Sequence, residues 1–113
     1  MEWLPADSGI LEADVVRWEE AIWAPKRRRR QNRPWGSQEV IGQVTALDAE
    51  YVSIKVMKAE ITENNIAAEL KPHRPGTVIR KKRVTLQKGG VQRMSWSDEG
   101  ARSAALREKK PPH

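Results

Sequence analysis

A two-residue alternation over Tyr51 to Ile61 constrains the fold of this chain more than any other feature. Val52, Ile54 and Val56 occupy every second position, and the residues between them are mostly polar. This period is typical of a β-strand with one buried face. The segment is therefore predicted to be a strand, entered through a short turn at residues 48–50.

Four further segments have strand character, because β-branched and aromatic residues alternate with polar ones between turn signals. They cover residues 15–23, 39–47, 77–86 and 91–96. The first has one largely apolar face, with Glu20 as the exception. Residues 66–70 fit either a short strand or a helical turn.

Glycine and serine mark the expected bends and ends of these elements. Gly42 predicts a bulge or bend within its strand. The Lys88-Gly89-Gly90 sequence predicts a hairpin turn, because glycine adopts positive φ without strain. Ser97 is expected to cap a terminal helix, with Asp98 favourable near its first turn.

Together these elements predict a mainly β protein. We expect a small antiparallel, partly open barrel of about five or six strands, with a long basic first loop and a short C-terminal helix. The expected organisation is an N-terminal extension over 1–11, a barrel domain over 12–97 with its basic loop at 25–38, and a helix with a disordered tail over 98–113.

In this strand layout, over residues 12–97, a long charged loop separates the first two strands and tight hairpins follow. The layout resembles the SH3-like small β-barrels, the group that includes KOW, Tudor and Sm-like domains. No motif accompanies the resemblance, so it points to no specific family. The chain as a whole also looks like small proteins of bacterial mobile elements, a likeness that adds no known activity; a bacterial regulatory or mobile-element accessory role is our expectation.

The positive charge of the chain is concentrated between the first two predicted strands. Six of eight consecutive residues there are basic, and six is also the net charge of the whole chain. Arginine side chains stay charged and form forked hydrogen bonds to phosphate oxygens, so this cluster predicts contact with nucleic acid. An acidic protein partner and a merely solvated loop are the alternatives. The cluster consists of Lys26, Arg27, Arg28, Arg29, Arg30 and Arg33.

A second basic block covers residues 71–96, which carry eight positive charges and no acid. From it we select Arg80, Lys82, Lys88 and Arg93 as candidate nucleic-acid contacts. Arg80 and Lys82 should share one face of their strand, and Lys81 and Arg83 the other. Charge on both faces is also what protects an edge strand from aggregation, so a structural role is an equal alternative.

Five tryptophans and one tyrosine supply all the aromatic rings. Trp18, Trp96 and Trp3 are expected in the core. Trp23 and Trp35 flank the basic cluster, and Trp35 is a candidate for stacking on bases. Tyr51 lies opposite the buried positions of its strand, which fits either a surface ring or a ring that covers a gap under the loop.

The charge pattern keeps a second functional class open. Residues 1–25 carry a net charge of minus five and residues 39–70 minus four, which a simple phosphate binder does not need. The alternative is a protein-interaction module or inhibitor that inserts its basic loop into an acidic groove of a nucleic-acid-handling enzyme. Alternating charge blocks would also permit a head-to-tail homodimer.

Catalytic chemistry finds no support. The chain has no cysteine, and its two histidines, His73 and His113, lack metal-ligand spacing. No carboxylate pair is tied to a nucleophile. We therefore expect a non-enzyme without a cofactor or metal. With no basic and apolar leader and no apolar stretch of about 20 residues, we also expect a cytoplasmic protein without membrane contact.

Overall fold

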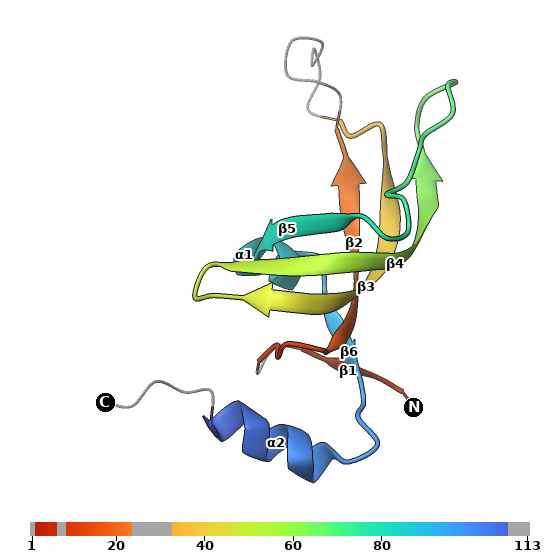
Figure 1. Cartoon of the computed structure of the whole chain (residues 1–113). Helices are drawn as coiled ribbons and strands as arrows, with labels where there is room; N and C mark the ends of the chain where they lie inside the picture. Colours follow the sequence, from red (N-terminus) through yellow and green to blue (C-terminus); the bar gives the residue numbers. More distant parts are fainter. Residues whose placement is uncertain (1, 7–8, 24–32, 109–113) are drawn as a thin grey trace.

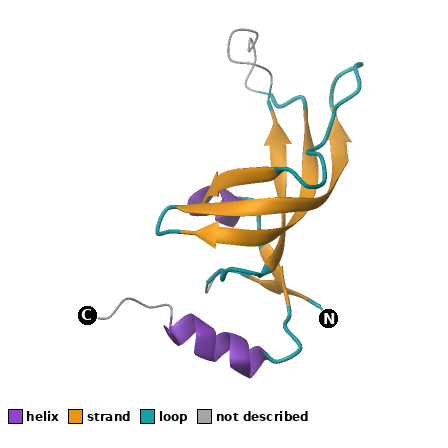
Figure 2. Cartoon of the chain, viewed as in Figure 1, coloured by secondary structure: helices purple, strands orange, loops and turns teal. Residues whose placement is uncertain are grey.

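The computed structural model describes residues 2–6, 9–23 and 33–108 and shows one open antiparallel sheet (Figure 1). The strand order in the described part is β1-β6-β2-β3-β4-β5. Two short helices accompany the sheet (Figure 2). The elements are β1 (Trp3–Pro5), β2 (Val15–Ile22), β3 (Gly36–Leu47), β4 (Tyr51–Asn64), β5 (Val78–Lys82), α1 (Arg83–Lys88), β6 (Gln92–Met94) and α2 (Glu99–Glu108).

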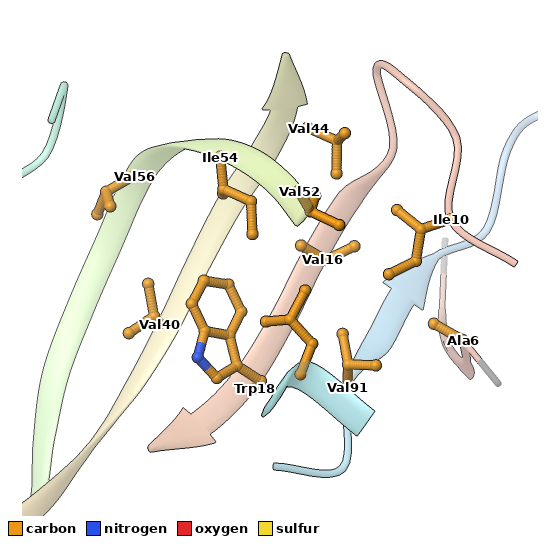
Figure 3. Close-up of a cluster of buried hydrophobic side chains, with 11 residues drawn as sticks. Ala6, Ile10, Val16, Trp18, Val40, Val44, Val52, Ile54, Val56 and Val91 are labelled. Carbon is orange, nitrogen blue, oxygen red and sulfur yellow. The ribbon is translucent and has the colours of Figure 1, made fainter. Parts of the chain in front are cut away.

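The predicted mainly β fold with a C-terminal helix is thus confirmed. The two-residue alternation in β4 buries one face of this strand, as expected. Val52, Ile54 and Val56 are fully buried, at 1% exposure or less. They join Trp18 of β2 and further apolar residues in a single core (Figure 3). The cluster consists of Ala6, Ile10, Val16, Trp18, Val40, Val44, Val52, Ile54, Val56, Leu86 and Val91.

β3 and β4 bend, so that their halves near β5 lie across β2 (Figure 1). The predicted irregularity at Gly42 is confirmed, since the register with β4 shifts between Ile41 and Gly42. A Cβ atom at Gly42 would lie 2.4 Å from Cγ2 of Ile54 and 2.7 Å from the carbonyl oxygen of Lys55. Close approach of the two strands therefore requires glycine here.

The curl of the sheet brings together strands that do not pair. Glu20 of β2 points inward, and its Oε2 accepts a hydrogen bond from Nζ of Lys81 on β5 at 2.8 Å. In the sheet order β3 and β4 lie between these strands. The ion pair therefore crosses the interior of the curled sheet.

The segment before β2 also belongs to the folded sheet. β1 pairs with β6 through Trp3 and Met94, and Ala6, Ile10 and Leu11 are buried. The guanidinium of Arg17 on β2 also lies 4.5 Å from the Trp3 ring of β1.

The predicted strand over 77–86 is wrong in its second half. β5 ends at Lys82, which pairs with Tyr51, the first residue of β4, so no partner backbone continues beyond it. The N–H of Arg83 instead donates to the carbonyl of Glu50, and the chain turns into α1. This helix places Leu86, which is fully buried, in the core.

The hairpin predicted at Lys88-Gly89-Gly90 is also wrong. The two glycines end α1, with Gly90 at a φ of 67°, and β6 then pairs with β2 and β1 instead of β5. A Cβ at Gly89 would lie 2.5 Å from the carbonyl oxygen of Glu19. The glycines therefore serve as a helix end and as a close contact with β2.

The expected cap at Ser97 is replaced by its neighbour. Oδ1 of Asp98 accepts a hydrogen bond from the N–H of Ala101 at 3.0 Å. Asp98 thus satisfies one of the free N–H groups at the start of α2. For residues 66–70, the structure shows neither of the two expected elements.

Candidate functional site

The outward side of β4 and β5 is the surface on which described candidate residues come together. Because Val52 and Ile54 face the core, the alternate residues of β4 face outward. The register places Tyr51 opposite Lys82, Ser53 opposite Arg80 and Lys55 opposite Val78. We call this surface the β4–β5 face. It comprises Tyr51, Ser53, Lys55, Met57, Val78, Arg80 and Lys82.

β5 is an edge strand of the described sheet, as its charge pattern indicated. Arg80 and Lys82 are exposed on its outward side, whereas Ile79 and Lys81 point inward. Alternate residues of a strand lie about 6.8 Å apart, so the two outward cations present separate contacts along one line. Their predicted common face is confirmed.

Arg80 and Tyr51 form a cation–ring contact on the β4–β5 face. Cζ of Arg80 lies 3.9 Å from the centroid of the Tyr51 ring. This distance is typical of a cation resting on an aromatic ring. The Arg80 side chain nevertheless stays 63% exposed. The tyrosine therefore orients the guanidinium while leaving it accessible to a ligand.

Two carboxylates of the β3–β4 turn lie beside these cations. Asp48 is 3.9 Å from Arg80, and Glu50 is 3.9 Å from Lys82. Backbone N–H groups of Tyr51 and Glu50 hold the pKa of Asp48 below its usual value, and the charges of Arg80 and Arg83 act in the same direction. Both ion pairs are long and exposed, so they neutralise the cations only weakly.

The remaining described candidates do not join the β4–β5 face. Lys26, Arg27, Arg28, Arg29 and Arg30 lie outside the described residues. Exposed Arg33 lines a hollow of about 460 Å³ with Pro34, Glu63 and Asn65, near the end of β4 that is remote from Tyr51.

Trp35 and Lys88 lie in the same region as Arg33. Half-buried Trp35 donates its N–H to Ile22 and accepts a hydrogen bond from the N–H of Asn65. Lys88 lines a groove of about 520 Å³ that also includes Glu19 and Glu63. Apart from Arg93, the described candidates therefore fall into two groups, at opposite ends of β4.

Arg93 is a structural residue. It is 8% exposed, and its guanidinium donates two hydrogen bonds to Glu99, of 3.0 and 2.6 Å. Because the Arg93 guanidinium is buried and bound to Glu99, it is not available to a ligand. In the sequence, Glu99 lies six residues after Arg93 as a possible partner, but the sequence alone does not show that the two side chains form an ion pair.

Of the three tryptophans expected in the core, Trp18 alone joins the buried cluster, and Trp3 and Trp96 are half-buried. Trp18 is buried and Trp3 is half-buried, whereas Trp23 is 45% exposed. Half-buried Trp96 donates its indole N–H to Oδ1 of Asp14 at 2.7 Å.

Sequence reasoning missed a polar cluster inside the curled sheet. Oε1 of Glu20 accepts a hydrogen bond from the indole N–H of Trp18 at 3.1 Å, and Oε2 accepts one from Lys81. Nε2 of His73 lies 3.5 Å from Oε1, and the N–H of His73 donates to the buried side chain of Gln38. The signal was Glu20 itself, the one carboxylate on the apolar side of β2.

The described part of the chain contains no grouping of three or more His, Asp or Glu residues suited to a metal ion. Its two helices are also too short and too polar to cross a membrane.

Comparison of the chain with protein-family models, curated proteins and solved structures found no match. The fold and the β4–β5 face therefore define its class: a mainly β protein with a cationic, aromatic sheet surface.

Proposed function

We propose that this protein binds nucleic acid through the β4–β5 face and catalyses no reaction. The observation that carries the proposal is the Arg80–Tyr51 contact at 3.9 Å, with Lys82 directly opposite Tyr51 on the same surface. Lys55, two residues beyond Ser53, adds a third exposed cation. Cations with an accessible aromatic contact are the usual components of a nucleic-acid surface.

The chemistry of the face favours contacts to the phosphate backbone. Lysine ammonium groups are point charges, and an oriented arginine adds forked hydrogen bonds to phosphate oxygens. The face contains neither a helix nor a paired ribbon that projects from the surface. It is therefore poorly suited to recognise base edges in the groove of a duplex. We infer modest sequence specificity, for either DNA or RNA.

The likeness to SH3-like small barrels is part of this proposal. Two observations support it: the long connection between β2 and β3, and the curl that lets Glu20 contact Lys81 across the sheet. A regulatory or accessory role in the cytoplasm, as in a mobile-element protein, fits a protein that binds without reaction. Small barrels serve several functions, so the surface carries more weight than the fold.

Charge removal from the β4–β5 face tests the proposal. The triple variant Lys55→Gln, Arg80→Gln, Lys82→Gln is compared with a control that loses three exposed cations elsewhere, Lys58→Gln, Lys71→Gln, Arg74→Gln. The affinity of each variant for fluorescently labelled DNA and RNA strands of 20 nucleotides is measured by fluorescence anisotropy at several salt concentrations. Each lost phosphate contact should reduce the slope of log K against log salt by about 0.7 to 0.9. Equal slopes for the two variants would contradict the proposal.

A protein partner with an acidic surface is the second candidate. Met57 and Val78, on the β4–β5 face, are 54% and 60% exposed. Apolar side chains beside cations are common at protein interfaces, and phosphate does not need them. Met57→Ser with Val78→Ser should weaken a defined protein complex in gel filtration after nuclease treatment while leaving nucleic-acid affinity unchanged.

A further inference from the structure

We propose that the Arg80–Tyr51 contact receives an unpaired base, so that the ligand of the β4–β5 face is single-stranded nucleic acid. This inference rests on the proposed function and adds the strandedness of the ligand. The two residues have different roles in this proposal: Arg80 contacts the base, and Tyr51 positions Arg80.

The geometry of the contact supports stacking. The Tyr51 ring lies against the Arg80 guanidinium at 3.9 Å, so one side of the guanidinium is covered and its orientation is restricted. The Arg80 side chain is still 63% exposed, which leaves a planar cation open to solvent. A guanidinium plane is a stacking surface for bases, and an arginine that is already oriented loses less entropy on binding.

The neighbours of Arg80 fit a strand whose bases turn toward the sheet. Ser53, directly opposite Arg80, is small and leaves room beside the guanidinium. Lys82 and Lys55 lie on either side along the face, at positions suited to the phosphates that flank a stacked base. The arrangement therefore alternates charge, stacking plane and charge.

A duplex cannot use this arrangement fully. Its bases are stacked within the helix, and exposing one costs unpairing and unstacking energy. Against a duplex, the face offers only its cations. The affinity difference between a single strand and an abasic strand with the same phosphates therefore reports the stacking contribution, which is roughly 5- to 150-fold per base.

The experiment compares three 20-mers by fluorescence anisotropy at one salt concentration: a mixed-sequence single strand, its duplex, and an abasic strand that keeps the phosphates. The wild-type protein should bind the single strand at least about fivefold more tightly than the other two. Arg80→Lys keeps the charge and loses the plane. It should reduce single-strand affinity to the level of the abasic strand, with an unchanged salt slope.

Two conservative variants serve as controls. Lys58→Arg conserves an exposed charge outside the β4–β5 face, and Tyr51→Phe keeps the ring that positions Arg80, so both should retain the preference for the single strand. Equal affinities for the three ligands, with Arg80→Lys like wild type, would overturn this inference and leave the proposed function standing. Absence of saturable binding to any of the three would overturn the proposed function itself. Circular dichroism of each variant excludes unfolding as the cause.

Discussion

Asp14 and Arg102 form a buried ion pair although 88 positions separate them in the chain. Nη2 of Arg102 lies 2.7 Å from Oδ2 of Asp14, and the two side chains are 4% and 0% exposed. The same carboxylate accepts hydrogen bonds from the N–H of Leu11 and the indole of Trp96. This carboxylate therefore connects α2 and the segment before it to the start of β2.

Replacing Asp14 with Asn should destabilise the protein strongly. The substitution leaves the Arg102 guanidinium buried without a counter-charge, which typically costs about 3 to 5 kcal/mol. Urea unfolding, followed by tryptophan fluorescence, measures the loss. Glu60→Gln is the control, because its 3.0 Å bridge to Lys58 joins side chains that are each 63% exposed. The control should cost less than about 1 kcal/mol, and comparable losses would contradict the prediction.

Glu99 should make stability depend on acid pH. Hydrogen bonds from Arg93, and then from the N–H of Trp96, lower the pKa of Glu99 from 4.5 to about 2. A lowered pKa means that the carboxylate stabilises the fold above pH 4.5, and that this contribution disappears as the pH falls toward 2. The free-energy gap between wild type and Glu99→Gln should therefore be largest at neutral pH. Urea unfolding from pH 7 to pH 2 tests this, and parallel curves would contradict it.

Ala13 carries a backbone conformation that favours glycine. Its φ is 77°, within the left-handed region, where a Cβ atom costs about 1 kcal/mol or more. Ala13→Gly should raise the free energy of unfolding by up to about 1 kcal/mol. Ala46→Gly, at an exposed position of β3, should lower it by about 0.5 to 1 kcal/mol. Thermal unfolding of both variants checks the opposite signs; a loss at both positions would disprove the strain.

The arginine cluster allows a test that depends on charge alone. Replacing Arg27 to Arg30 with Ala removes four of the six positive charges of the cluster. Affinity for DNA or RNA should fall, and the dependence of log K on log salt should flatten. Anisotropy titrations over a salt series give both quantities. An unchanged slope would contradict the prediction that the cluster contacts nucleic acid.

The strands were predictable because their signal is local. The two-residue alternation over 51–61 identified β4 and its buried residues. Gly42 predicted the irregularity in β3. Period two also placed Arg80 and Lys82 on one side of β5, because successive side chains point to opposite faces. For the candidate site, this was enough to select Arg80 and Lys82, but it neither selected Lys55 nor decided whether the Tyr51 ring lies at the surface.

The errors arose where distant backbone decides the outcome. Residues 83–86 have strand character, yet β4 begins at Tyr51, and beyond Lys82 there is no strand left to pair. Gly89 and Gly90 suit a hairpin or a helix end equally, and the helix before them decided between the two. The sequence alone indicates a surface cation at Arg93, whereas in the structure Arg93 donates hydrogen bonds to Glu99.

The sequence by itself determined the class of the fold, its principal strands and the concentration of positive charge, since these depend on side-chain period and composition. Only the tertiary structure decided which charges are available. Lys81 and Arg93 are engaged by Glu20 and Glu99, whereas Arg80 lies exposed against Tyr51. The physical reason is that ion pairs and ring contacts form between side chains that the curl of the sheet brings together, and sequence separation does not reveal that proximity.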